Sequence, residues 1–275
     1  MRIKRVFLLL SLLPVILVIL FAGPLLTLNP LRTGYRPVPF SGPRGERQGT
    51  VYIDRKITEN LAVPDPAPGM KALEDFHRLA FSRKLQIYIC RDRKEMRRIF
   101  PFFRTDGSGF AWAGSLICIN YERARENGYA LEPLIKHEAA HSLLYQNLGG
   151  IRDRLAMATG VNRWFREGLA VFNQGFYTMT ERQLEQALED NRIRYEAKKT
   201  SFAVEPKNFR TDYNLYGRFI EYLERTYGRE PLENLIALMV RDFTDGGNHF
   251  FRVYGRSLQE ELALFRDKVS FTQDS

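Results

Sequence analysis

Two histidines and a glutamate in one short stretch are the residues best suited to chemistry. His137-Glu138-Ala139-Ala140-His141 follows Pro133 and lies among apolar residues, a pattern typical of a helix. Residues four apart share a helix face, so the rings of His137 and His141 can bind one metal ion. Glu138 then lies beside the metal, where it can take a proton from a metal-activated water. The spacing therefore predicts a zinc site with a general base.

Chance placement of the two histidines is the alternative to a metal site. It would leave two surface imidazoles with an unrelated glutamate between them. The chain has only 4 His, so finding two of them at this spacing by accident is improbable. The metal site is therefore the interpretation that the sequence favours.

A third ligand is needed, because catalytic zinc usually has three protein ligands and one open position. The best candidate is Glu167, in a short predicted helix with Asn162 as its N-cap and Gly175 as its end. Apolar neighbours such as Trp164 and Leu169 indicate a buried helix, where a carboxylate needs a cationic partner. An exposed helix glutamate is the alternative.

The two motifs together resemble a known group of enzymes. The HExxH turn followed by Trp164-Phe165-Arg166-Glu167-Gly168-Leu169-Ala170 is similar to the gluzincins, specifically the peptidase MA-like domain related to thermolysin and aminopeptidase N. The resemblance covers residues 85–269. It implies a zincin-like metallopeptidase domain in which zinc is held by His137, His141 and Glu167, with Glu138 as the catalytic base.

The resemblance also points to a later tyrosine. Residues 212–223 are similar to the helix that follows the third ligand in these enzymes, and Tyr213 matches the tyrosine that stabilises the oxyanion. A positioned phenol can donate a hydrogen bond to the charge that develops as water attacks an amide. Tyr216, nearly one turn later, is the alternative donor, and core packing is an alternative role for either tyrosine.

Two departures from the family pattern bear on activity. Val171 stands four residues after Glu167, where thermolysin-like relatives often have an acid that orients a ligand histidine, so that support must come from elsewhere or be weaker. The Gly-x-Met-Glu-Asn motif of the aminopeptidase N group is absent, and Asn120 and Glu122 do not reproduce it. An endopeptidase, or an enzyme that cleaves one special partner, is therefore favoured over an aminopeptidase.

The surrounding elements predict an α+β fold. Alternating or apolar runs predict strands at 51–53, 85–90 and 115–120, and helical patterns cover 70–79 and 91–100. The Gly- and aromatic-rich segment 110–113 is expected to form either a substrate-binding edge or an ordinary hairpin strand. After the metal helix the pattern is almost all helical. Two capping boxes occur there, Thr180 with Gln183 and Ser257 with Glu260. The layout is a small N-terminal sheet and a mainly helical C-terminal half.

The N-terminus predicts a membrane anchor. Residues 1–5 form a basic tail expected in the cytoplasm, and 6–28 are uncharged, apolar and long enough to cross a bilayer. A cleaved signal peptide is the alternative, although Pro24 makes a poor cleavage site. Residues 29–50 are rich in Pro, Gly and Arg and are interpreted as a linker to the peptidase domain at 51–275. That domain is expected on the periplasmic or extracellular side of a single-pass protein.

The charge pattern bears on the class of binding partner, and the two cysteines raise the question of a disulfide. The net charge of +9 is scattered among acids, which argues against a nucleic-acid-binding surface. Cys90 and Cys118 lie in the exported part and form either one disulfide or two buried thiols. The expected partners are a peptide or protein substrate and the membrane. A zinc-binding scaffold without turnover is the main alternative, and Glu138 argues against it because a structural site needs no base.

Overall fold

The computed structural model describes most of the chain after the predicted anchor. The described residues are 34–41, 47–57, 61, 63–100, 107–189, 192–205 and 208–271. The predicted tail at 1–5 and the predicted anchor at 6–28 lie outside them, so the membrane placement stays a prediction. Within the described residues, no helix has both the length and the apolar character that a membrane span requires.

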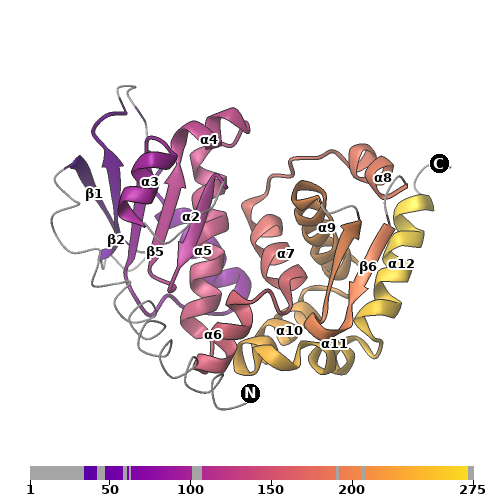
Figure 1. Ribbon diagram of the computed structural model, residues 1–275. Coiled ribbons are helices and arrows are strands. Elements are labelled where there is room, and N and C mark those ends of the chain that lie inside the picture. Colours follow the sequence, from indigo (N-terminus) through magenta and orange to yellow (C-terminus); the bar gives the residue numbers. More distant parts are fainter. Residues whose placement is uncertain are drawn as a thin grey trace, which may run out of the picture.

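A five-stranded sheet forms the first half of the fold (Figure 1). Its strand order is β1-β2-β3-β5-β4, with β2, β3 and β5 parallel and with β1 and β4 antiparallel at the two edges. The strands are β1 (Tyr35–Ser41), β2 (Arg47–Asp54), β3 (Leu85–Cys90), β4 (Gly109–Trp112) and β5 (Leu116–Asn120). The predicted strands at 51–53, 85–90 and 115–120 are confirmed.

Helices cover both faces of this sheet, which is why β3 and β5 are apolar along almost their whole length. On one face, Ile87 and Ile117 pack with Leu143 of the metal-site helix α5. On the other face, Tyr88 packs with Met96 of α3. The helices of this half are α2 (Ala67–His77), α3 (Arg93–Ile99), α4 (Tyr121–Glu126) and α5 (Leu131–Asn147), and they confirm helices near 70–79 and 91–100.

The interpretation of residues 29–50 as a linker is partly wrong, because strand β1 lies inside this segment. β1 pairs with β2 from Tyr35 opposite Asp54 to Ser41 opposite Arg47. Pro37 and Pro39, which made the segment resemble a linker, are compatible with an edge strand because an edge residue can lack a ladder donor. The folded region therefore begins before residue 51.

Cys90 and Cys118 lie on the neighbouring strands β3 and β5. Both are buried free thiols, and their sulfur atoms are 3.3 Å apart. The hydroxyl of Tyr35 donates to the Cys90 sulfur at 3.6 Å. Of the two alternatives that the sequence leaves open, the structure contains the pair of thiols.

The second half is built around an aromatic core. Trp164 is its centre, with Phe202, Phe219 and Phe250 around the indole ring. The helices are α6 (Ile151–Ala158), α7 (Arg163–Gln174), α8 (Glu181–Glu189), α9 (Phe209–Tyr227), α10 (Arg229–Arg241), α11 (Gly246–Tyr254) and α12 (Leu258–Phe271), with short 3₁₀ turns at Ala197–Lys199 and Phe243–Asp245. Both predicted capping boxes are confirmed by their reciprocal hydrogen bonds.

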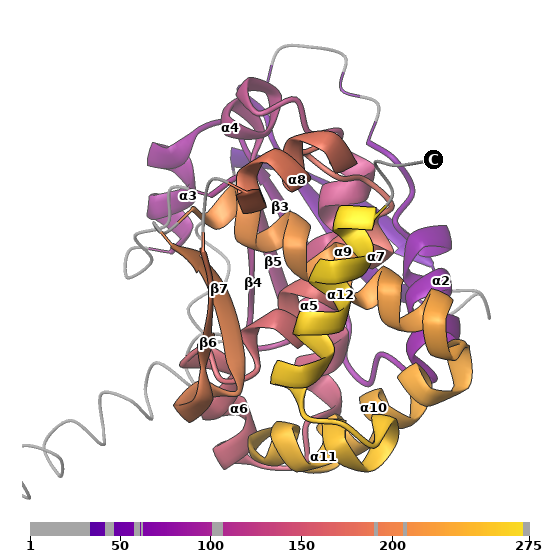
Figure 2. The ribbon, with the colours of Figure 1, turned by 90° about the vertical axis from the view of Figure 1, so that its right-hand side faces the viewer.

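An antiparallel hairpin corrects the expectation that the second half is almost all helical. Strands β6 (Arg192–Glu196) and β7 (Ser201–Glu205) pair beside the helices (Figure 2). The hairpin fixes the start of α9, since Asp212 accepts a hydrogen bond from the Val204 backbone at 2.7 Å. Tyr216 donates to the Phe202 carbonyl from the same side of α9.

Close packing of α7 against α9 depends on one glycine from each helix. A side-chain carbon at Gly168 would lie 2.8 Å from the Tyr216 carbonyl oxygen and 2.8 Å from Ile220. A side-chain carbon at Gly217 would lie 2.5 Å from Val171 on α7. Real side-chain atoms do not approach so closely, so the spacing of the two helices requires glycine at both positions.

We expect Gly168→Ala to destabilise the protein, because the added methyl must push α9 away from α7. Overpacking of this kind lowers the free energy of unfolding by about 1–3 kcal/mol. Gly69→Ala is the matched control, since its added carbon would be no closer than 3.7 Å to Lys136. Its unfolding free energy should stay unchanged or rise by up to about 1 kcal/mol, because alanine favours helix. Urea unfolding of both variants tests this, and equal stabilities would contradict it.

Candidate metal centre

Two neighbouring helices bring together the residues that the sequence proposes as metal ligands (Figure 1). His137 and His141 lie one turn apart on α5, and Glu167 lies on α7. Glu167 Oε2 is 3.8 Å from His137 Nε2 and 3.2 Å from His141 Nε2. One donor atom from each of the three residues lies within 4.8 Å of the others. The three side chains therefore face a common point between the helices.

The donor set and its spacing fit a zinc ion. Ligands about 2.0–2.1 Å from a tetrahedral zinc lie about 3.4 Å from one another, and the two distances to Glu167 fall on either side of this value. Burial lowers the pKa of His137 to about 3, and His141 adds to the effect. The imidazole is then neutral, which is the form that binds metal.

Arg166 determines which oxygen of Glu167 faces the histidines. Its guanidinium donates from Nε and Nη2 to Glu167 Oε1, at 3.1 and 2.5 Å, and from Nη1 to the Met157 carbonyl. Burial opposes ionisation of Glu167, but Arg166 and the imidazoles hold its pKa well below the usual range. Glu167 is therefore an ionised carboxylate whose Oε2 is available to a metal ion.

Gln174 orients His137 from the last turn of α7. Its amide nitrogen donates to the Phe176 carbonyl, so its Oε1 is the atom that accepts from His137 Nδ1, at 3.0 Å. With the proton on Nδ1, the lone pair of Nε2 points toward Glu167. Two acceptor atoms then face each other, an arrangement that a cation stabilises.

His141 lacks comparable support. In the part of the chain that the structure describes, its Nδ1 is buried and has no hydrogen-bond partner. The sequence predicts that support comes from elsewhere or is weaker, because Val171 occupies the position where relatives often have an acid. Gln174, seven residues after Glu167, supplies that support to His137 alone.

Glu138 lies deep in the site and is 5% exposed. Burial raises its pKa to about 7, and the nearby His141 partly opposes this effect. Strand β4 passes directly beside the carboxylate, since a side-chain carbon at Gly109 would lie 2.9 Å from Glu138 Oε1. A carboxyl group with a pKa near neutrality can both accept and return a proton.

The two candidate tyrosines have different surroundings. The ring of Tyr213 lies 6.5 Å from the ring of His137, and Arg163 donates to its hydroxyl at 3.4 Å. The negative charge of Glu167, together with burial, raises the pKa of Tyr213 to about 12. Tyr216 is buried instead in the aromatic core, with its hydroxyl on the Phe202 carbonyl. Tyr213 is therefore the one that borders the proposed ligands.

Three further residues around the site were missed from the sequence. Arg163, Arg166 and Gln174 all lie on α7, at four residues before, one before and seven after Glu167. Offsets of four and seven place residues on the same face of a helix. This spacing was the available signal for Arg163 and Gln174.

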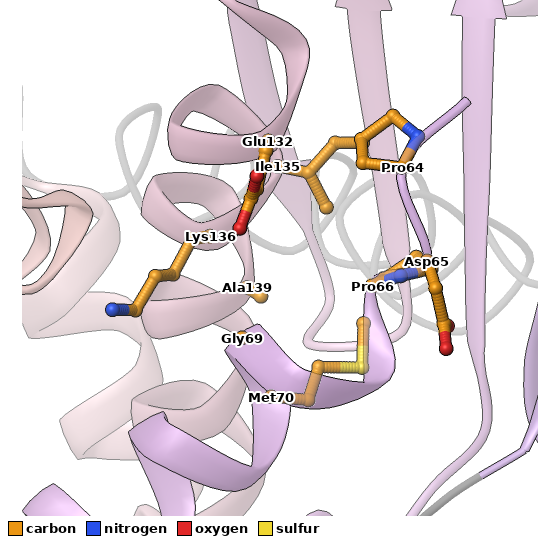
Figure 3. A pocket seen from close by; sticks show the side chains of 9 residues that line it. All are labelled: Pro64, Asp65, Pro66, Gly69, Met70, Glu132, Ile135, Lys136 and Ala139. Carbon is orange, nitrogen blue, oxygen red and sulfur yellow. The ribbon is translucent and has the colours of Figure 1, made fainter. Parts of the chain in front are cut away.

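The small pocket in Figure 3 lies on another side of α5. Its lining includes Ile135, Lys136 and Ala139 of α5 together with Gly69 and Met70 of α2. Ala139 is two residues from His137 and from His141, so it projects from nearly the opposite side of the helix. The pocket is therefore separate from the proposed metal centre.

No protein-family model matches the chain, and no curated protein matches it either. The resemblance to the gluzincins therefore depends on the residues of the two motifs.

We expect the full-length protein to bind about one zinc per chain, and His141→Ala and Glu167→Ala to lose most of it. Gln174→Leu should keep the ligands but weaken zinc affinity by about 10–100-fold, because His137 would lose the acceptor that orients it. Competitive titration with a chromophoric chelator measures these affinities.

Gln259→Leu is the matched control, because Gln259 is an exposed residue of α12. Its zinc affinity should equal that of the wild type. An unchanged affinity in Gln174→Leu would show that Gln174 does not orient the ligand.

Proposed function

We propose that the chain is a zinc metallopeptidase of the gluzincin type with a zincin-like fold, anchored in a membrane by residues 6–28. The observation that carries the proposal is the convergence of His137, His141 and Glu167 beside the buried carboxylate of Glu138. Neutral imidazoles and an ionised carboxylate form a typical catalytic zinc set. When bound, zinc supplies Lewis acidity that activates water and polarises the carbonyl of a peptide bond.

The chain's own residues account for the proton transfers in this proposal. Glu138, with a pKa near 7, accepts the proton of the attacking water and later passes it to the leaving amine. The hydroxyl of Tyr213 donates a hydrogen bond to the oxyanion that forms on the carbonyl. Arg163 already donates to the oxygen of this hydroxyl, which leaves its proton free for the substrate.

Strand β4 supports a peptide as the substrate. It is an edge strand of the sheet, and Gly109 brings it against Glu138. An extended peptide can pair with an exposed strand edge, and its backbone then runs past the catalytic base. The absence of an amine-binding Gly-x-Met-Glu-Asn motif favours an endopeptidase.

Glu138→Gln tests the assignment of the base. The amide cannot accept the proton of the attacking water, so kcat should fall by about 10²–10⁴-fold while zinc affinity is retained. Cleavage of a peptide library, followed by mass spectrometry, and zinc titration measure the two quantities. Full activity in this variant would refute the role of Glu138. A wild type that binds zinc and cleaves no peptide would support a scaffold instead.

Tyr213→Phe tests the oxyanion donor. Loss of one such donor lowers kcat by about 10²–10³-fold with little change in KM. Tyr216→Phe is the control, because it removes a hydroxyl of the same chemistry that donates to the Phe202 carbonyl. That variant should lose stability but keep its kcat. The opposite pattern in steady-state kinetics would exchange the roles of the two tyrosines.

A further inference from the structure

Arg163 is a partly buried cation beside the proposed metal centre. It is the first residue of α7, one helical turn before Glu167. Its guanidinium lies over two rings of α9, 4.8 Å from the centre of Phe209 and 5.4 Å from that of Tyr213. The two aromatic contacts and the hydrogen bond to the Tyr213 hydroxyl hold the guanidinium in one place.

No carboxylate pairs with Arg163 in the part of the chain that the structure describes. Its neighbour Arg166 is paired with Glu167, and Arg218, which also lies over an aromatic ring, is paired with Glu221. Glu167 attracts Arg163 only from beyond ion-pair distance. A partly desolvated cation without a carboxylate is costly, and this cost is offset when an anion binds.

The guanidinium contacts a residue that borders the proposed metal centre. It donates to the hydroxyl of Tyr213, whose ring lies beside the ring of His137. A group bound to Arg163 would therefore lie within a few residues of the bond being cleaved. Phe209 borders the same place with a side chain that is 49% exposed.

We infer that Arg163 is a specificity residue that binds a carboxylate of the peptide substrate next to the cleaved bond. A guanidinium has five N–H donors in a planar fork that matches a carboxylate, and the Tyr213 hydroxyl accepts only one of them. The carboxylate belongs either to the C-terminus of the peptide or to an acidic side chain. The inference rests on the proposed peptidase function and deepens it.

Three pools of fluorescent random octapeptides separate these sources. The first has a C-terminal amide and no Asp or Glu, the second has a free C-terminal carboxylate and no Asp or Glu, and the third has a C-terminal amide and includes Glu. The full-length, zinc-loaded protein in detergent is compared with Arg163→Met, which keeps the length of the side chain and removes its charge. The measured quantity is the ratio of kcat/KM for each acidic pool to that for the neutral pool.

We expect the wild type to prefer one acidic pool by at least about 10-fold, the effect of a charge-assisted hydrogen-bonded pair. The pool that is preferred identifies the source of the carboxylate. Arg163→Met should bring the ratio close to one. Arg154→Met is the matched control, because Arg154 also lies over an aromatic ring, that of Tyr145, but belongs to α6. Arg154→Met should have the same ratio of kcat/KM values as the wild type.

Two results would overturn the inference: equal cleavage of all pools by the wild type, or a preference that persists in Arg163→Met. A fall in kcat that is equal for all pools would assign Arg163 to the positioning of Tyr213 instead.

A binding measurement separates this inference from the peptidase proposal. Fluorescence anisotropy of the three pools is measured with zinc-loaded Glu138→Gln and with the double variant that also carries Arg163→Met. Tighter binding of an acidic pool that depends on Arg163 supports carboxylate recognition even where the wild type cleaves nothing, a result that would refute only the peptidase. Equal affinities would refute carboxylate recognition.

Discussion

A buried carboxylate held against two imidazoles is the interaction on which the rest of the structure depends. Glu167 is 4% exposed, and burying its charge in an apolar core is costly without partners. Arg166 neutralises one oxygen, while the other faces His137 and His141. This arrangement exists only because α7 lies directly against α5. The aromatic core, the glycine contacts and the hairpin all serve to hold α7 and its neighbours there.

Helix α7 belongs to both halves of the molecule. Ala170 packs in the cluster that covers the sheet, whereas Trp164, Phe165 and Leu169 pack in the aromatic core of the second half. The residues of α7 that contact the site extend from its first residue, Arg163, to its last residue at position 174. A helix packed on two sides has little freedom to shift. The position of α7 is thus set by packing that is almost entirely apolar, whereas hydrogen bonds from Arg166 and Gln174 orient the side chains of Glu167 and His137.

The sequence anticipates that the three proposed ligands lie together, because the signals for them are local. The spacing of His137 and His141 and the apolar setting of Glu167 follow from helical periodicity, and the three residues do meet. Tyr213 and Tyr216 were harder to separate, because the difference depends on a hydrogen bond to Phe202 in a hairpin that the sequence did not reveal. Long-range strand pairing leaves little trace in a short window of sequence.

Prolines misled the sequence interpretation at the start of the fold, and they make the two edges of the sheet unequal. The Gly34 carbonyl accepts a hydrogen bond from the Arg55 N–H. In an antiparallel pair the direction of the backbone groups alternates, so the even-numbered residues of β1 direct their N–H and C=O groups toward β2. The backbone of Pro37 and Pro39 therefore faces away from β2. Because proline has no N–H, these two positions lack the backbone donors with which another chain would pair. Such gaps discourage aggregation through β1. The opposite edge strand, β4, contains no proline and lies beside Glu138, so the two edges differ in the side that the proposed pairing with a peptide would use.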